Sequence, residues 1–232
     1  MAAIPLVFLP GLLEDADAFA AQIGKLQAIA PCTVADLTRS DSIAAMAADA
    51  LREAPPGPLA IAGHSMGGYV ALELMRQAPG RIAKLALLCT NARPDSAEST
   101  ANRRRLMALA ERDFEAVIQA LMPRLLAPAH LADEGITGVI TGMALGIGKE
   151  AFARQENAII GRIDSRPHLA AIRAKTLVVA ARGDAIMPME VLEEMANAIA
   201  GARLEVIEDC GHMASLEQPE RLAHLLAQWL RD

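Results

Sequence analysis

Ser65 is the residue of this sequence best suited to act as a nucleophile. It lies in the middle of Gly63–Gly67, which reads GHSMG, after the apolar run Leu59–Ala62 and before the helical pattern Met66–Gln77. This arrangement predicts a strained strand-to-helix turn that exposes the serine hydroxyl, with the glycines leaving room where strand and helix pass closely. The N-terminus of the helix would also place N–H groups beside an oxyanion. A glycine-rich turn with no chemical role is the alternative.

Asp184 and His212 supply the other groups that serine chemistry needs. A serine hydroxyl is a weak nucleophile, so it needs a base, and the base needs a carboxylate to orient it. Asp184 follows the apolar run Thr176–Ala181, and His212 follows the run Arg203–Ile207. Each has an ordinary explanation as well, because Gly-Asp is common in turns and a lone histidine is more often structural. Three such residues at three strand ends, in the order Ser, Asp, His, nonetheless favour a catalytic triad.

The remaining histidines are not expected to act as the base. His64 is adjacent to Ser65 in the predicted turn, so its side chain is expected to point away from the serine. The others fall in predicted helices or loops of the surface, namely His130, His168 and His224.

The stretch Leu9–Leu12, which reads LPGL, is expected to complete the site. In a turn of the kind predicted around Ser65, one oxyanion donor is the N–H of the next residue, here Met66. The second donor comes from the loop after a neighbouring strand, and we assign it to the N–H of Leu12. A plain turn is the alternative, and Pro10, which has no N–H, would stiffen the loop in either case.

The elements that must position these residues alternate along the chain, which indicates a parallel sheet with helices on both faces. The predicted strands are Ile4–Leu9, Cys32–Leu37, Leu59–Ala62, Ile82–Cys89, Thr176–Ala181 and Arg203–Ile207. The predicted core helices are Asp15–Ala30, Ser42–Ala54, Met66–Gln77, Met189–Ile199 and Glu220–Leu230. The alternation lapses between Arg93 and Ala170, where helices with turns near Pro123, Pro128 and Gly148 are expected. We therefore predict a core of residues 1–92 and 171–232, with residues 93–170 inserted as a helical cap where such folds bind ligands.

Taken together, these motifs resemble the α/β-hydrolase superfamily along nearly the whole chain. The resemblance rests on LPGL at 9–12, GHSMGG at 63–68, RGD at 182–184 with Pro188, and CGH at 210–212 with EQP at 217–219. It implies an α/β-hydrolase fold, the triad Ser65, Asp184 and His212, and catalysis without a metal or an organic cofactor. Some relatives take the acid from an earlier strand end, which makes Asp95 the rival of Asp184. Many relatives open with a β-hairpin that this chain lacks, so about six strands are expected.

The resemblance leaves the substrate open, because one fold serves many reactions. The superfamily includes carboxylesterases, lactonases, thioesterases, C–C bond hydrolases of ring-cleavage pathways and cofactor-free haloperoxidases. We predict hydrolysis of a small carboxylic ester, or of a related thioester or lactone, through an acyl-enzyme on Ser65. Cleavage of a C–C bond next to a ketone by the same triad is one alternative. A ligand sensor that keeps the triad but turns over slowly or not at all is another.

Substrate selection is expected to lie in residues 93–170, for which no single binding residue is predicted. Cationic side chains there suggest either a carboxylate clamp or solvated helix faces: Arg103–Arg105, Arg154, Arg162 and Arg166. The acidic partners in the second case would be Glu111, Glu115, Glu156 and Asp164. Three methionines suggest either a pocket lining or simple packing: Met107, Met122 and Met143. Four glycines suggest either a mobile lid or close helix packing: Gly135, Gly138, Gly142 and Gly146.

Composition narrows the class of partner. The 232 residues are 53% hydrophobic and 3% aromatic, with a formal net charge of −6, which suits one buried core and disfavours nucleic acid as a partner. Cys32, Cys89 and Cys210 have neither disulfide nor zinc spacing. The sequence shows no signal-peptide pattern, and the apolar stretch Ile136–Ile147 is too short to span a bilayer. We therefore expect a cytoplasmic enzyme of a small-molecule substrate with no membrane partner; its oligomeric state is not predicted.

Overall fold

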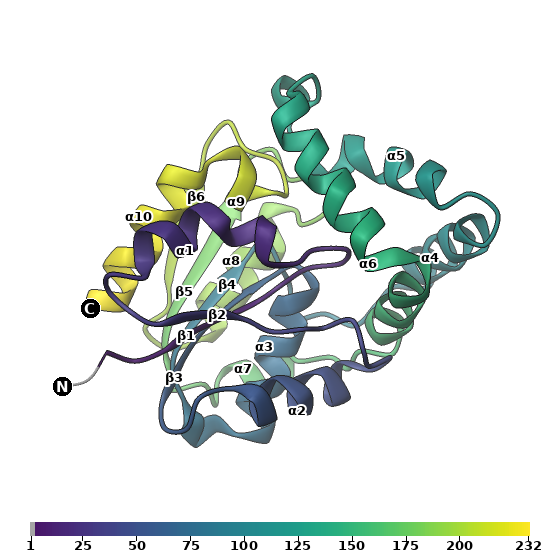
Figure 1. Ribbon diagram of the computed structural model, residues 1–232. Coiled ribbons are helices and arrows are strands. Elements are labelled where there is room, and N and C mark those ends of the chain that lie inside the picture. Colours follow the sequence, from purple (N-terminus) through teal and green to yellow (C-terminus); the bar gives the residue numbers. More distant parts are fainter. Residues whose placement is uncertain (1–2) are drawn as a thin grey trace.

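The computed structural model describes residues 3–232 and contains one sheet of six parallel strands. Their order across the sheet is β2-β1-β3-β4-β5-β6. The strands are β1 (Leu6–Leu9), β2 (Cys32–Val34), β3 (Leu59–His64), β4 (Ile82–Leu88), β5 (Lys175–Ala181) and β6 (Arg203–Ile207). The predicted α/β architecture and the six-strand sheet are therefore confirmed (Figure 1).

Helices follow the strands much as the sequence predicts, with one clear difference near the N-terminus. The predicted helix Asp15–Ala30 is a 3-10 turn followed by a short α-helix, because Phe19 leaves helical geometry (φ −118°, ψ 10°) between them. The helices of the core are η1 (Ala16–Phe19), α1 (Ala20–Leu26), α2 (Ile43–Glu53), α3 (Met66–Gln77), η2 (Pro79–Arg81), α8 (Met189–Ala198), α9 (Ala214–Glu217) and α10 (Pro219–Arg231).

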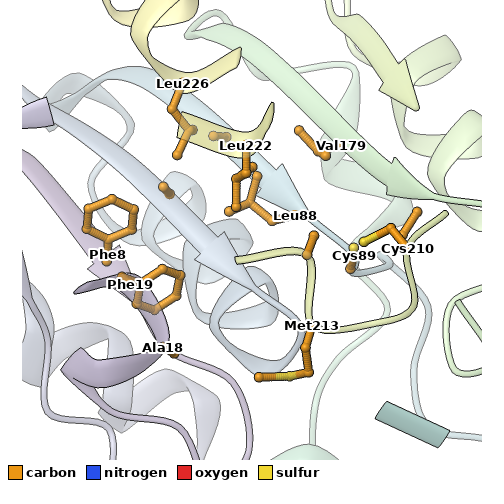
Figure 2. Close-up of a cluster of buried hydrophobic side chains, with 14 of the residues drawn as sticks. Phe8, Ala18, Phe19, Leu88, Cys89, Val179, Cys210, Met213, Leu222 and Leu226 are labelled. Atoms are coloured by element: carbon orange, nitrogen blue, oxygen red, sulfur yellow. The ribbon is translucent and has the colours of Figure 1, made fainter. Parts of the chain in front are cut away.

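Each face of the sheet is covered by its own set of helices. Leu6 and Phe8 of β1 belong to a buried apolar cluster with α1 and α10, and Phe8 stacks on Phe19 with ring centroids 4.7 Å apart. Figure 2 shows these two rings side by side. The intervening residues Val7 and Leu9 belong to a second cluster with α2, α3 and α8. Alternate residues of a strand point to opposite faces, so both faces become apolar and the strands read as continuous apolar runs.

The chain between β4 and β5 forms a group of helices that we term the α4–α7 segment. It comprises α4 (Ala97–Ala110), α5 (Phe114–Leu125), η3 (Pro128–His130), α6 (Glu134–Ile160) and α7 (Arg166–Leu169). Figure 1 shows α4, α5 and α6 grouped at one side of the sheet. Among residues 3–232, no helix combines the length and apolarity needed to cross a membrane. The division into a core and a cap at residues 93 and 170 stays a prediction, and residues 1 and 2 of that core lie outside the described residues.

Two features of α6 test the interpretations of its glycines, a mobile lid or close helix packing. The helix is kinked at Gly148, whose φ of 81° and ψ of 165° are not helical, as the predicted turn near this residue anticipated. A Cβ added at Gly138, Gly142 or Gly146 would meet no atom within 4 Å. Close helix packing through these three glycines is therefore the wrong interpretation, and the mobile lid stays a prediction.

Candidate active site

Ser65 lies in the tight turn that joins β3 to α3. Its φ of 50° and ψ of −115° lie outside the regions that ordinary residues occupy, so the turn is strained. The N–H of Ser65 donates a hydrogen bond to the carbonyl oxygen of Leu88 over 3.0 Å. The hydroxyl of Thr90 donates to the carbonyl oxygen of Ser65 over 2.8 Å. The end of β4 and the loop after it thus hold the strained conformation.

The glycines around Ser65 are required by close backbone contacts. A Cβ at Gly63 would lie 2.4 Å from the carbonyl oxygen of Gly67, at the approach of strand to helix that the sequence predicted. A Cβ at Gly67 would lie 1.9 Å from the carbonyl oxygen of Leu9, the last residue of β1 and the first of the LPGL stretch. Gly67 therefore brings α3 against a second neighbour that the sequence did not indicate.

Asp184 and His212 come together although 28 residues separate them in the chain. Nδ1 of His212 lies 2.7 Å from Oδ2 of Asp184, and both side chains are almost fully buried. The other carboxylate oxygen of Asp184 accepts hydrogen bonds from the N–H groups of Ile186 and Met187. Burial raises the pKa of the Asp184 carboxyl, but the charge and hydrogen bond of His212 and the two N–H groups outweigh it and lower the pKa below its ordinary value. A carboxylate of this kind fixes the orientation of the imidazole ring.

Asp95, the rival acid, lies elsewhere in the site. Its carboxylate accepts from the hydroxyl of Thr100 over 2.8 Å and from Arg162 over 2.8 Å, and it pairs with Arg103 at 3.4 Å. The acid bonded to His212 is Asp184. The structure therefore favours Asp184 as the orienting acid.

Ser65 and His212 line one cavity of about 180 Å³. Within residues 3–232 the ring of His212 is bonded to Asp184 and not to the serine hydroxyl. Hydrogen bonds between catalytic groups are often long before substrate binds. Apolar side chains from the α4–α7 segment line part of the cavity: Leu106, Ile118, Leu121, Leu125, Ile140 and Met143. Of the other two methionines considered, Met122 is buried in the apolar core and Met107 packs against it.

Charged side chains also line the cavity. Arg103 bonds Glu156 over 2.7 Å, Arg162 bonds Asp95 over 2.8 Å, and the Arg162 guanidinium lies 4.4 Å from the centroid of the Tyr69 ring. Burial raises the pKa of the Glu156 carboxyl above its ordinary value, although Arg103 acts in the opposite direction. Arg124, which was not among the six arginines considered for a carboxylate clamp, also lines the cavity. Of those six, which are alike in sequence, Arg103 and Arg162 form part of the cavity wall. The others lie outside it: Arg104 and Arg105 are exposed, Arg154 bonds the carbonyl oxygen of Thr38, and Arg166 pairs with Asp164.

In the loop after β1, the N–H groups on either side of Leu12 are already hydrogen-bonded. The N–H of Gly11 donates to Glu14 over 2.8 Å, and the N–H of Leu13 donates to Gln155 of α6 over 3.0 Å. Between them, Leu12 lines the cavity, and within residues 3–232 its N–H has no acceptor. Met66 is the first residue of α3, where an N–H has no partner inside its helix. The assignment of Leu12 and Met66 as the two donors stays a prediction that this geometry supports.

The α4–α7 segment also supports the loop that carries His212. The carbonyl oxygen of Leu125, at the end of α5, accepts the N–H groups of His212 and Met213 over 2.9 and 3.2 Å. Glu217 accepts the N–H of Ala127 over 2.8 Å. The expectation that residues 93–170 bear on substrate choice alone is therefore wrong, because Leu125 also holds the backbone of His212 and Met213.

Several residues that support the site are not indicated by the sequence, among them Glu14, Gln155 and the bonded ring of His64. As expected, the ring of His64 does not serve Ser65; it lies between Glu14 and the carbonyl oxygen of His212. Gln155 carries no local signal, since its partners lie far away in the chain. Only the combination of an acidic residue and an apolar surrounding in Leu12–Leu13–Glu14 hinted at a buried carboxylate.

Comparisons with known proteins agree on the family of this chain. Residues 6–225 match the family model described as the alpha/beta hydrolase family. A thermophilic esterase from Thermogutta terrifontis, solved with malate bound, is 31% identical with a TM-score of 0.90 over 99% of this chain and 90% of that chain. The pimeloyl-[acyl-carrier protein] methyl ester esterase of Aromatoleum aromaticum is 29% identical over 79% of this chain and 78% of its own length. The 2-hydroxy-6-oxo-6-phenylhexa-2,4-dienoate hydrolase of Comamonas testosteroni is 27% identical, and the match covers 74% of this chain and 62% of that enzyme.

Proposed function

Because this chain belongs to the alpha/beta hydrolase family, we propose that it is a serine hydrolase of small carboxylic esters, with related thioesters or lactones as close substrates. One observation carries the proposal. A histidine oriented by a buried aspartate lines the same cavity as a serine held in a strained turn at a helix N-terminus. That set contains a nucleophile, a base and an orienting acid, which is the requirement for acyl transfer through a serine.

In the proposed reaction, Oγ of Ser65 attacks the ester carbonyl carbon while His212 takes the hydroxyl proton. The carbonyl oxygen becomes an oxyanion that the N–H groups of Leu12 and Met66 stabilise. The C–O bond to the alcohol then breaks, and His212 gives its proton to the leaving alkoxide. Water repeats the sequence on the acyl-enzyme, with His212 again as base, and releases the acid and free Ser65. Asp184 keeps the imidazole in the tautomer that these transfers need.

Two observations support the proposed substrate class, the first its ester bond and the second its modest size. Two of the similar proteins are named as esterases, in one case of a methyl ester. The cavity of about 180 Å³ is below the volume of common drug-sized sites, which start near 300 Å³. We further propose that residues 93–170 act as the cap that selects the substrate, since this segment supplies the apolar wall of the cavity.

The test joins labelling with burst kinetics. A fluorophosphonate should modify Ser65 and no other serine, as shown by intact mass and peptide mapping. A chromogenic acetate or butyrate ester should give a burst of one leaving group per chain, followed by slower turnover. Ser65→Ala should abolish both signals. Labelling that persists in Ser65→Ala would overturn the proposal, and a burst without turnover would favour a ligand sensor.

A second candidate is hydrolysis of a C–C bond next to a ketone. The similarity to the Comamonas testosteroni hydrolase favours it, and the same triad would serve. A ring-cleavage product and a series of chromogenic esters assayed on one preparation separate the two. A kcat/KM for the ring-cleavage product at least about 100-fold above that of the best ester, which corresponds to about 2.7 kcal/mol of transition-state stabilisation, would make C–C cleavage the function.

A further inference from the structure

The buried ring of His64 has an oxygen acceptor at each of its two nitrogens. Nδ1 lies 2.8 and 2.9 Å from the two carboxylate oxygens of Glu14. Nε2 lies 2.8 Å from the carbonyl oxygen of His212. A neutral imidazole has one N–H and one lone pair, so it would turn a lone pair toward one of these oxygens. The contacts are all satisfied when His64 is an imidazolium that donates from both nitrogens.

The pair formed by Glu14 and His64 is shielded from solvent. The two side chains are 4% and 2% exposed. Burial acts to lower the pKa of His64, but the charge of Glu14, its hydrogen bond and the carbonyl oxygen of His212 outweigh it, so the pKa is raised. A buried ion pair of this type holds its partners in one geometry and is costly to break by removal of one member.

The same carboxylate also fixes the loop after β1. Glu14 accepts the N–H of Gly11 over 2.8 Å, and a Cβ at Gly11 would lie 2.5 Å from that carboxylate. Leu13, which has a φ of 60°, is held by Gln155. With the residues on both sides of it bonded, Leu12 has little freedom. Glu14 and His64 therefore connect the loop of Leu12 to the backbone of His212.

We propose that Glu14 and His64 are positioning residues of the reaction: their buried pair sets the Leu12 N–H and the backbone of His212 at a fixed separation across Ser65. This inference rests on the proposed function. Neither residue exchanges a proton with the substrate. Their contribution is to have the oxyanion donor and the base in place before substrate arrives, where a displacement of about 1 Å lowers turnover on the order of 100-fold.

A purely structural pair makes a different prediction. If Glu14 and His64 only stabilise the fold, their loss lowers the melting temperature and leaves the chemical step of the folded fraction intact. The variants Glu14→Gln and His64→Gln keep the size of the side chains and remove the charge. Leu26→Ala is the matched control, since Leu26 is fully buried in α1 and takes no part in the cavity.

The experiment measures kcat and KM for a chromogenic ester, the rate of Ser65 phosphonylation and the melting temperature for each variant. We expect Glu14→Gln and His64→Gln to lower kcat and the phosphonylation rate by about 10- to 100-fold, with KM changed less than about threefold. The double variant should lose no more kcat than the single variant with the larger loss, because the two residues act as one unit. Leu26→Ala should lower the melting temperature and leave both rates near those of the unmodified chain.

Three outcomes overturn the inference. The first is a Glu14→Gln variant that has a lower melting temperature but an unchanged kcat and phosphonylation rate, as expected for Leu26→Ala. The second is a double variant whose loss is the product of the two single losses. The third is a nitrogen-15 NMR spectrum at pH 6, below the ordinary pKa of histidine, in which His64 carries a proton on one ring nitrogen only. Failure of the proposed function is distinguishable from all three, because the unmodified chain would then give neither a burst nor a label at Ser65.

Discussion

Thr90 donates its hydroxyl hydrogen to the carbonyl oxygen of Ser65 over 2.8 Å, so a residue from the loop after β4 supports the strained serine. Thr90 also lies against α3, since a Cβ at Gly68 would be 2.3 Å from its hydroxyl oxygen. The carbonyl oxygen of Ser65 accepts a second hydrogen bond from the N–H of Gly68 over 2.9 Å. The serine carbonyl therefore keeps one partner when the threonine hydroxyl is removed.

Thr90→Val should lower the free energy of unfolding by about 1 kcal/mol and reduce kcat toward esters several-fold, because the serine turn loses one of its supports. Urea unfolding and steady-state kinetics measure the two effects. Thr176→Val is the matched control, since Thr176 is buried and its hydroxyl donates to the carbonyl oxygen of Ala174 away from the cavity. If both variants lose stability equally and neither changes kcat, the support from Thr90 has no bearing on the chemistry.

Asp184→Asn should lower kcat on the order of 10³- to 10⁴-fold with the fold intact, because His212 loses the carboxylate that sets its tautomer. Asp95→Asn should instead act mainly on stability, at about 3 kcal/mol, since Arg103 and Arg162 lose a buried carboxylate partner. Stopped-flow acylation rates and urea unfolding of both variants provide the comparison. A larger loss of acylation rate in Asp95→Asn would reassign the orienting acid.

Stability should depend on pH through His64. The pKa of His64 is raised above its usual value of 6.5 in the folded chain, so the folded state binds the proton more tightly than the unfolded state. This contribution is fully present below pH 6.5 and is lost as the pH rises through the folded pKa. The charged and titratable groups that act on the ring are Glu14, Asp184 and His212.

Urea unfolding between pH 6 and 9 should therefore show a free energy of unfolding that declines with rising pH. In His64→Gln this part of the decline should disappear, whereas His224→Gln, a change in α10, should retain it. A profile for His64→Gln that is parallel to that of the unmodified chain would show that the ring is neutral in the folded state.

Replacement of the α6 glycines by alanine should change the free energy of unfolding in opposite directions, depending on the position. Gly138→Ala and Gly142→Ala should each raise the free energy of unfolding by about 1 kcal/mol, because a methyl group there meets open space and alanine favours helix. Gly148→Ala should lower it, because a φ of 81° with a ψ of 165° is strained for any other residue. If the segment is a lid, the first two changes should also slow bulky esters more than small ones. Equal effects on both ester sizes would exclude the lid.

Much of the fold could be predicted from the sequence because local rules determine it. A strand buried on both faces is a continuous apolar run, so Leu59–Ala62 is visible without knowledge of its neighbours. GHSMG predicts the turn at Ser65 because Gly63 is required by a contact within a few residues, the close approach to Gly67. The residues Asp184 and His212 could be placed because both follow strand ends, which meet at one edge of a parallel sheet.

The supports of the site could not be predicted, because they join distant segments. Glu14 meets His64 across 50 residues, and Leu13 meets Gln155 across 142. Glu14 and Gln155 do not differ in type or spacing from nearby surface residues. Their burial, which only the structure shows, reveals their roles as supports. The arginines show the same limit: Arg103, Arg104 and Arg105 are alike in sequence, and the orientation of α4 decides that only Arg103 enters the cavity wall.

The hydrogen bonds that Gln155 and Leu125 make outside the α4–α7 segment limit how freely this segment can be exchanged. An engineer who grafts residues 93–170 from a relative, in order to import its specificity, would also replace the acceptors of Leu13 and of the backbone at His212. A chimaera that lacks an amide at the position of Gln155 would carry the imported pocket above a loosened Leu12–Leu13 loop. A graft that exchanges the pocket therefore also exchanges the supports of the loops at Leu13 and His212, and a successful graft has to begin after the contacts of Leu125 and leave Gln155 in place.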